Sequence, residues 1–220
     1  MPRRAPALDI SAIVAGLGGL GVDEQGEVGN ALLDATADLV AAYGVRRWSV
    51  DDVAERSGLG RTTVYRHFDG RDDLVAAALA RDARRLFAAI ADAVEHLCGL
   101  EDKLVEGFLV GLGAVRRTLL PRLIETDTTT ALNLLTGDLV LALSRQALIE
   151  RYRLLMPDGD QTDADLVAEA LVRLAISFVV MPGSLIDMDD PDTARRQLRR
   201  LIVPLLQPGA GAVLPERPGG

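Results

Sequence analysis

Cysteine, aromatic residues and long apolar runs are all scarce in this sequence. Cys98 is the single cysteine in 220 residues, which excludes an intrachain disulfide and a cysteine-rich zinc site. No apolar run approaches the roughly 20 residues that a membrane-spanning helix needs, so we expect no membrane partner. No signal peptide opens the sequence, and we expect a protein of the reducing cytoplasm.

Patterns typical of β-strands are also scarce. Ala, Leu, Arg, Glu and Asp dominate, and no alternation of polar and apolar residues continues beyond a few positions. With 49% hydrophobic residues, the chain can nevertheless bury a substantial core. These features predict an all-α fold with one small domain and one larger domain.

The formal charge of −8 is unusual for a DNA-binding protein, because duplex DNA is a dense polyanion. The charge is unevenly distributed, however. Six arginines and four acidic residues lie between Arg46 and Arg71, so this segment carries +2 and the remainder of the chain −10. A weakly basic module on an acidic body is typical of a protein that binds short DNA sites and is repelled elsewhere.

The segment from Gly44 to Leu74 predicts two short helices joined by a tight turn, with a third helix directly after them. Ser49 and Asp52 match a capping box at the start of the first helix. Residues 57–60, Ser-Gly-Leu-Gly, end that helix, because glycine readily adopts left-handed dihedral angles.

The second of these helices covers Thr62 to His67 and has two different faces. Val64 and Phe68 lie four residues apart and can pack on the preceding helix. The other face consists of side chains that donate hydrogen bonds to phosphates or base edges. This arrangement predicts a helix-turn-helix whose second helix enters the major groove.

The same residues resemble the signature of TetR-family transcriptional regulators. The matching residues are Ala54-x-x-Ser57-Gly58-Leu59, Thr63-Val64-Tyr65-x-His67-Phe68 and Arg71-x-x-Leu74. The resemblance implies that Thr63, Tyr65 and His67 contact phosphates, whereas Arg61, Thr62 and Arg66 face bases. The full set of predicted DNA-binding residues is Ser49, Arg61, Thr62, Thr63, Tyr65, Arg66, His67 and Arg71.

Three positions depart from the family pattern. Gly60 stands where Ser or Thr commonly caps the recognition helix, which costs about 1 kcal/mol of helix stability at most. Thr62 stands where Gly or Pro is common, and Arg71 replaces a lysine and keeps its charge. These departures leave the base preference open.

Residues 1–29 form a predicted N-terminal extension, either an arm or a short helix. Residues 16–21 match the G-x-G-x-x-G pattern of dinucleotide-binding folds, but the strand and helix that this mechanism requires are missing from the sequence around them. Arg3 and Arg4 could reach a minor groove as an arm does, although a disordered tail is the simpler interpretation.

Residues 30–74 form the predicted DNA-binding domain. Asn30 matches the cap of a support helix that ends at Gly44. Trp48 comes directly before the capping serine, where it could contact the DNA backbone or fill the core of the domain. We favour the core.

Residues 75–207 form the predicted larger helical domain, followed by a disordered tail over 208–220. The helix from Arg71 to about Gly99 belongs to both domains, so a shift at its far end must move the recognition helix. Further helices are predicted over 101–119, 123–135 and 138–155, from Asp163 to the break at Pro182, and from Pro191, with a kink or an end at Pro204.

The last two predicted helices have apolar faces too broad for one small body to cover. A four-helix bundle between two copies would cover them, and the TetR resemblance implies the same homodimer. The predicted interface residues are Leu166, Ala170, Leu174, Phe178, Leu198, Leu201, Ile202 and Leu205.

The resemblance also implies a small-molecule effector site within the larger domain. Few aromatic residues and many Leu, Val and Ala favour an apolar ligand. For each candidate residue, an ordinary place in the core is the alternative. The candidates are Phe87, Ile90, Phe108, Leu112, Asn133, Tyr152, Ser177 and Phe178.

No arrangement in the larger domain predicts catalysis. Ser144 has no histidine near it in the sequence, and acidic pairs such as Glu101-Asp102 lie at predicted helix starts, where they interact favourably with the helix dipole. His96 and Cys98 are two residues apart on different helix faces, which gives a metal site little support. We expect neither an enzyme nor a metal or cofactor site.

The leading hypothesis is a ligand-responsive homodimeric regulator, a repressor if it follows its family. It would leave a near-palindromic operator in double-stranded DNA when a small apolar effector binds. The alternative is a helical small-molecule binding protein whose helix-turn-helix no longer contacts DNA, which the low net charge of the module and the missing cap at Gly60 favour. An all-α hydrolase would need a nucleophile and a base that the sequence does not display.

Overall fold

The computed structural model describes residues 26–136, 145–146, 148–149, 161–181, 183 and 185–206. These residues contain helices and no strand, so the predicted all-α fold is confirmed. Nearly all of the predicted N-terminal extension, the tail and most of the predicted helix over 138–155 lie outside the described residues. The helices are α2 (Gly26–Tyr43), α3 (Val50–Ser57), α4 (Arg61–His67), α5 (Arg71–Val94), α6 (Leu100–Val115), α7 (Leu120–Thr126), α8 (Thr128–Thr136), α10 (Gln161–Val180) and α11 (Pro191–Ile202), with a short 3₁₀ turn over Val203–Leu206.

The helix-turn-helix comprises α3 and α4, and local chemistry sets the turn between them. Ser49 caps α3 through the predicted capping box: the Asp52 N–H donates to its Oγ, while the Ser49 N–H donates to Asp52 Oδ2 at 2.7 Å. Gly58 ends α3 with φ 69°, in the left-handed region that favours glycine. Gly60 caps α4 without a side-chain hydrogen bond. The two-helix turn is therefore confirmed.

Helix α2 begins at Gly26, and Asn30 lies in its second turn, so the prediction that Asn30 caps this helix is wrong. Asn30 instead accepts hydrogen bonds from Arg81 Nη1, at 3.2 Å to its carbonyl oxygen and 3.4 Å to its Oδ1. Arg81 is buried and also pairs with Asp34 of α2 at 2.8 Å. This arginine of α5 links the shared helix to the support helix by charge and hydrogen bonds.

A first hydrophobic core holds the helix-turn-helix together and continues into α7 and α8. Val53 of α3 and Val64 of α4 are fully buried, and they pack with α2 and the start of α5. Leu123 of α7 and Ala131 of α8 are fully buried in the same cluster. By chain order these two helices follow α6, yet they pack on the end of the molecule that carries the helix-turn-helix. We call this cluster the first core.

Trp48 belongs to the first core, as we predicted. Its side chain is buried, and its Nε1 donates a hydrogen bond to the Gly44 carbonyl oxygen at 2.9 Å. This bond satisfies the indole N–H away from water, so the tryptophan fills space without an unpaired polar group.

A second core joins α6, α10 and α11. Val105 of α6, Leu171 of α10 and Leu198 of α11 are its buried members from each helix. Across the α6–α11 contact, Arg195 pairs with Glu106 at 2.8 Å. Helix α11 ends at Ile202, two residues before Pro204, as predicted from the missing N–H of proline.

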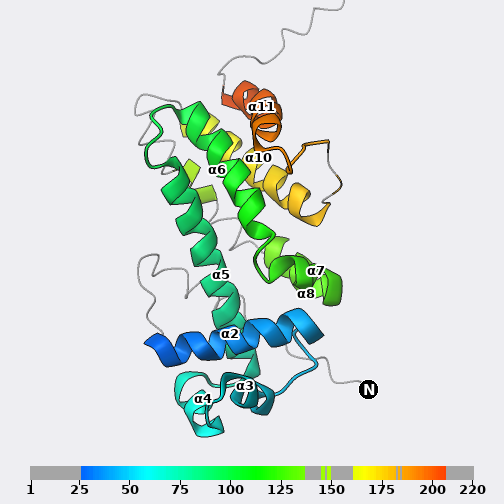
Figure 1. Cartoon of the computed structure of the whole chain (residues 1–220). Coiled ribbons are helices and arrows are strands. Elements are labelled where there is room, and N and C mark those ends of the chain that lie inside the picture. The colour runs from blue at the N-terminus through cyan, green and yellow to red at the C-terminus, as the bar shows by residue number, and fades with distance from the viewer. Residues whose placement is uncertain are drawn as a thin grey trace, which may run out of the picture.

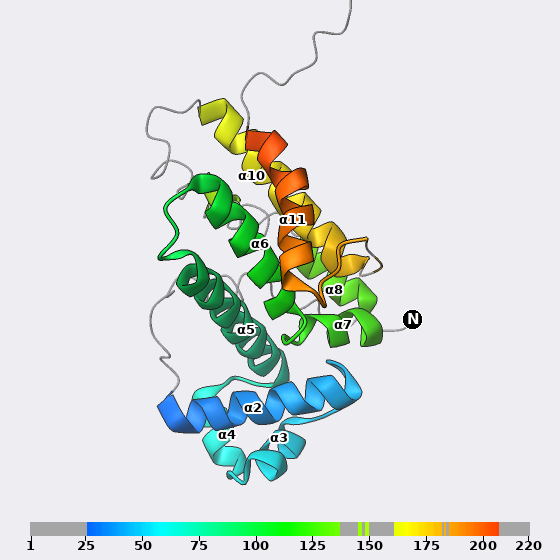
Figure 2. The ribbon, with the colours of Figure 1, turned by 45° about the horizontal axis from the view of Figure 1, so that its top comes forward.

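Figure 1 shows how α5 connects the two cores. α2 crosses the lower end of α5, with α3 and α4 beyond it at one end of the molecule. α6 runs beside α5, and α10 and α11 lie at the opposite end. Both views place α7 and α8 above the C-terminal end of α2 (Figures 1 and 2). The DNA-binding end therefore contacts the rest of the chain through α5 and through α7.

Candidate DNA-binding face and effector cavity

The polar face of α4 points away from the first core. Arg61, Thr62, Tyr65 and Arg66 are exposed, whereas Val64 on the opposite face is fully buried. The helical period separates Thr62 and Arg66 from Val64, because each lies two residues from it and therefore on the opposite side of the helix, whereas Arg61 is exposed at the helix start. An exposed tyrosine and two exposed arginines on a short helix leave their donors available to a nucleic acid.

Arg61 is held by two neighbours on this face. Its Nη1 lies 3.0 Å from Asp51 Oδ1 of α3, and its guanidinium carbon lies 5.5 Å from the centre of the Tyr65 ring. Hydrogen bonding with Tyr65, followed by the charge of Asp51, raises the pKa of Arg61. The arginine therefore stays charged and is oriented across both helices of the motif.

The remaining predicted DNA-binding residues flank this centre. Ser49 is exposed at the start of α3, where hydrogen bonds from its backbone and side chain lower the pKa of Asp52. Thr63 and His67 are half-buried, and the His67 ring lies 6.4 Å from that of Phe68. Arg71 is half-buried at the start of α5 and donates to the Arg46 carbonyl oxygen at 3.4 Å.

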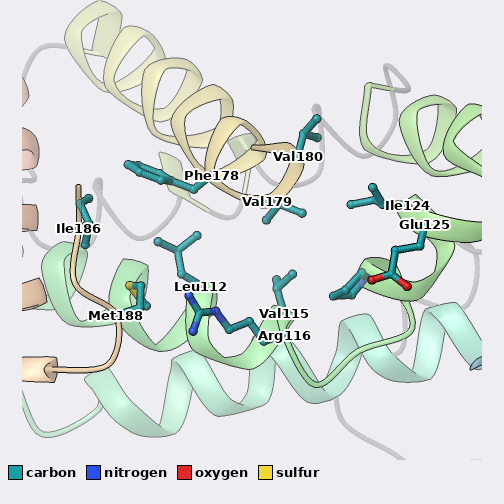
Figure 3. Close-up of a pocket in the computed structure, with 11 residues that line it drawn as sticks. Leu112, Val115, Arg116, Ile124, Glu125, Phe178, Val179, Val180, Ile186 and Met188 are labelled. Atoms are coloured by element: carbon teal, nitrogen blue, oxygen red, sulfur yellow. The ribbon is translucent and has the colours of Figure 1, made fainter. Parts of the chain in front are cut away.

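A cavity of about 220 Å³ lies between the two cores. Figure 3 shows Phe178, Val179 and Val180 of α10 on one side and Leu112 and Val115 of α6 on the other. Its lining residues are Leu112, Val115, Arg116, Pro121, Ile124, Glu125, Phe178, Val179, Val180, Ile186 and Met188. Nine of these eleven side chains are apolar, so the cavity suits a largely apolar ligand.

The predicted effector residues are distributed unevenly around this cavity. Leu112 and Phe178 line it, and Phe108 packs edge-on against Phe178 with 6.0 Å between ring centres. Ile90 lies against Gly107 and Gly111, where α5 and α6 approach closely. Phe87 and Ser177 are half-buried outside the lining, Asn133 is exposed on α8, and Tyr152 lies outside the described residues.

The sequence analysis did not single out Arg116 or Glu125, the two charged residues of the lining. Arg116 follows the last residue of α6, and Glu125 lies in α7. The available signals were a pair of arginines at the end of an apolar helix and a proline break at Pro121. Neither signal predicts that α7 folds back to close the cavity.

Helix α7 contacts the cavity with one face and the DNA-binding end with the other. Ile124 lines the cavity, whereas the Arg122 Nε donates a hydrogen bond to the Ala41 carbonyl oxygen at the end of α2. Just beyond α7, Asp127 pairs with Arg46 at 3.0 Å. Burial alone would raise the pKa of Asp127, but hydrogen bonds from Thr130 and Arg46 outweigh it, and the pKa is lowered. A single short helix thus joins the cavity to the loop before α3.

The predicted dimer residues fall into two groups. Leu166 of α10 and Leu201 of α11 are exposed, as is Leu205 of the 3₁₀ turn, and Ala170, Leu174 and Phe178 are half-buried. Leu198 and Ile202 are fully buried in the second core, so their assignment to the interface is wrong. These two residues lie four apart on the face of α11 that packs on α6, and a partner cannot reach them.

No helix within the described ranges is long and apolar enough to cross a bilayer. Within the same ranges, no three side chains of His, Cys, Asp or Glu gather closely enough to hold a metal ion.

A capped helix-turn-helix with a polar second helix, joined by a shared helix to a helical body, defines a helix-turn-helix transcriptional regulator. Residues 32–78 match the family described as bacterial regulatory proteins, tetR family, and residues 86–204 match the bacterial tetracyclin repressor, C-terminal domain. The chain belongs to the TetR family.

The chain is similar to several proteins of this kind. It is 29% identical over 190 residues to an uncharacterized HTH-type transcriptional regulator of Mycobacterium tuberculosis, Rv1255c, covering 82% of this chain and 86% of that protein. It is 29% identical to the regulator AlkX of the same organism, and the match covers 81% of this chain and 84% of that protein. The fold is also similar to the crystal structure of the TetR family repressor AlkX from Dietzia, which is implicated in biodegradation of n-alkanes. The TM-score is 0.59 at 24% sequence identity, and the match covers 80% of this chain and 96% of that chain.

Proposed function

We propose that this TetR-family regulator is a homodimeric repressor that leaves its operator when a small, largely apolar effector fills the cavity between the two cores. The observation that carries this proposal is the double contact of α7, whose residues line the cavity and also bind the end of α2. A ligand that displaces α7 has a direct path to the helix-turn-helix.

The exposed face of α4 supports the DNA-binding part of the proposal. Tyr65 and Thr63 would hold phosphates, and Arg66 and the oriented Arg61 would contact base edges. In a twofold dimer, two such helices would enter successive major grooves about 34–36 Å apart on a near-palindromic site. Ser49, Thr62, His67 and Arg71 would complete the contact with the DNA backbone and bases.

Exposed apolar side chains near the second core support the dimer. Leu166, Leu201 and Leu205 are each more than a third exposed, which is costly for a monomer when several leucines occur together. A second copy that covers them, together with the half-buried Ala170, Leu174 and Phe178, would place the two helix-turn-helix motifs on the same side.

The cavity supports a ligand response. An effector acts on DNA binding only through its differential affinity for two states, and a state with α7 displaced differs from the present one by the contacts between α7 and α2. Two relatives are called AlkX, and the Dietzia protein is implicated in biodegradation of n-alkanes. A hydrocarbon-like effector fits the nine apolar lining residues of this chain.

Duplexes selected by the protein from a random library provide the test. The enriched sequence should be a near-palindrome bound by two chains. Thr63→Ala and Tyr65→Phe should weaken binding to all duplexes by about three- to tenfold, because each removes one phosphate contact. Arg66→Ala should change which bases are selected. Arg117→Ala, at an exposed position after α6 and outside both the helix-turn-helix and the predicted interface, is the matched control and should change neither.

Two outcomes would refute parts of the proposal. Equal binding by the wild type and all α4 variants would remove α4 from the DNA contact. Absence of any salt-dependent DNA affinity, with tight retention of an apolar ligand, would indicate a helical small-molecule binding protein instead.

A further inference from the structure

The two charged residues of the cavity are not equivalent, and the difference specifies the effector. Glu125 is closely neutralised: Arg122 Nη1 lies 2.8 Å from its Oε2 on the same helix. Arg116 has a much looser partner, because its Nη1 lies 3.9 Å from Asp189, whose side chain is 97% exposed. A well-hydrated carboxylate at that distance holds an arginine weakly.

Arg116 also lies at the edge between cavity and solvent. Its side chain is 57% exposed although the residue lines the cavity. Figure 3 shows the guanidinium beside Leu112, toward Met188, whereas Ile124 and Glu125 lie beyond Val115. A ligand can therefore keep a charged head partly in water at Arg116 and place its apolar part among the aliphatic residues. This avoids the cost of burying an unpaired charge.

We infer that the effector is an amphipathic anion, an alkyl-chain carboxylate or an equivalent monoanion, whose head group binds Arg116 and whose chain runs toward Ile124 of α7. This inference rests on the effector site of the proposed function. The cavity volume of about 220 Å³ lies below the roughly 300–1,000 Å³ of most small-molecule sites. At about 30 Å³ per non-hydrogen atom, the share of one molecule in liquid water, it favours a chain of medium length, about seven carbons beyond the head group.

The head group and the alkyl chain of the ligand make different contacts in this orientation. The carboxylate replaces Asp189 as the partner of Arg116 and fixes the ligand in one orientation. The terminal methyl groups reach the side of the cavity formed by α7, the helix that contacts α2. A neutral alkane fills the same apolar space but leaves Arg116 without a bound partner.

Calorimetric titration with octanoate, 1-octanol and octylamine tests the inference, because these probes share one chain and differ in head group. We expect the wild type to bind octanoate about tenfold more tightly than 1-octanol, as for one charge-assisted hydrogen bond. Arg116→Gln should remove this preference while leaving the affinity for 1-octanol unchanged. Arg116→Lys should keep most of the preference. Arg117→Gln, the exposed neighbour outside the lining, is the matched control and should behave as wild type.

Several results would overturn the inference. They are equal or tighter binding of 1-octanol, a preference for octylamine, an equal loss of the preference in Arg117→Gln, and absence of binding by all three probes. A parallel loss of both octanoate and 1-octanol binding in Arg116→Gln would also contradict it, since Arg116 would then only support the fold.

DNA binding measured in parallel separates this inference from the proposed function. If octanoate binds through Arg116 without changing operator affinity, the ligand class stands and the proposed ligand response fails. If no probe binds while the operator is bound normally, the inference fails and the DNA-binding role stands.

Discussion

The first and second cores differ in how much of their surface the chain itself covers. The first core joins residues from six helices, including fully buried Leu32, Val64, Leu74 and Leu123. The second core buries Leu198 and Ile202, but leucines near it on α10 and α11 remain exposed. The first core carries the proposed DNA-binding face, whereas the second has exposed apolar surface where the proposed partner would bind, and it borders the cavity of the proposed effector.

The border between the two cores does not follow the order of the chain. α6 lies in the second core, yet α7 and α8, which come after it, lie in the first. The cavity lies at this border, with α7 on one side and α6 and α10 on the other. A ligand that displaces α7 would change the contacts between α7 and α2 inside the first core, and the proposed ligand response depends on this change.

Truncation of Leu123 gives the largest effect and tests whether α7 belongs to the first core. Leu123→Ala should lower the free energy of unfolding by about 2–5 kcal/mol, because the side chain is fully buried and leaves a cavity. Hydrogen exchange should become faster in α2, α3 and α4 as well as in α7. Leu198→Ala, equally buried in the second core, should cost a similar amount but increase exchange mainly in α6 and α11.

The same two variants can also contradict the assignment of α7 to the first core. If Leu123→Ala increased exchange in α10 and α11 while leaving α2 to α4 unchanged, α7 would belong energetically to the second core.

Gly44 is the next test, because two separate constraints act on it. Its φ of 75° is strained for any residue with a Cβ, and an added Cβ would lie 2.9 Å from the Cβ of Thr126 at the end of α7. Gly44→Ala should therefore cost about 1–2 kcal/mol for the left-handed conformation, plus a further amount for pushing α7 away from α2. Urea denaturation measures the total loss in the free energy of unfolding, and hydrogen exchange in α7 shows whether this helix has been displaced.

Gly58→Ala provides the matched control within the first core. Its φ is 69°, but an added Cβ would meet nothing within 4 Å. It should show only the conformational cost and no change in α7. Equal destabilisation by the two substitutions would mean that the contact between Gly44 and Thr126 contributes nothing to the joining of α7 and α2.

Helix caps allow the two cores to be compared through substitutions with smaller costs of similar size. Ser49 caps α3, and Asp190 caps α11 by accepting from the Asp192 and Thr193 N–H groups. Ser49→Ala and Asp190→Ala should each cost about 0.5–2 kcal/mol in urea denaturation. Ser49→Ala should also weaken DNA binding, whereas Asp190→Ala should not. A loss of DNA affinity in Asp190→Ala as large as that in Ser49→Ala would show that the second core also controls the α3–α4 surface.

The sequence predicted the first core far better than the border between the cores. The capping box at Ser49, the glycine at position 58 and the apolar pair Val64 and Phe68 all act over a few residues, so their spacing is sufficient to place α3 and α4. The role of Trp48 was predictable for the same reason. The helical period also predicted that the polar face of α4 is exposed and that Val64 is buried.

The cavity was harder to predict because it depends on contacts between distant segments. Leu112 and Phe178 were found, but Arg116 and Glu125 became lining residues only because α7 folds back toward α2. Arg81 shows the same limit, because its partners Asn30 and Asp34 lie about fifty residues earlier in the chain. For α11, the amphipathic pattern was clear, but it could not tell a face that packs on α6 from one that meets a partner.

The smallest expected effect concerns Asp82, which joins α5 to the start of α7. Its Oδ2 accepts a hydrogen bond from the Leu119 N–H at 2.7 Å, and burial raises the pKa of Asp82 despite this bond and the nearby arginines. Because the folded pKa exceeds the unfolded one, the contribution of this group to stability is greatest at low pH and declines as pH rises through the folded pKa. Asp82→Asn should remove this decline and leave stability at neutral pH unchanged or slightly higher.

Asp82→Ala separates the charge from the hydrogen bond. It leaves the buried Leu119 N–H without its acceptor, so it should cost about 1–3 kcal/mol at every pH, whereas the asparagine keeps an acceptor in place. Urea denaturation of the wild type, Asp82→Asn and Asp82→Ala between pH 4 and pH 8 measures the free energy of unfolding of each protein. The comparison gives both the pH dependence that Asp82 causes and the cost of losing the hydrogen-bond acceptor. If wild type and Asp82→Asn lost stability in parallel over this range, the titration would belong to another group. The hydrogen bond that attaches the start of α7 to α5 would then be independent of pH over this range.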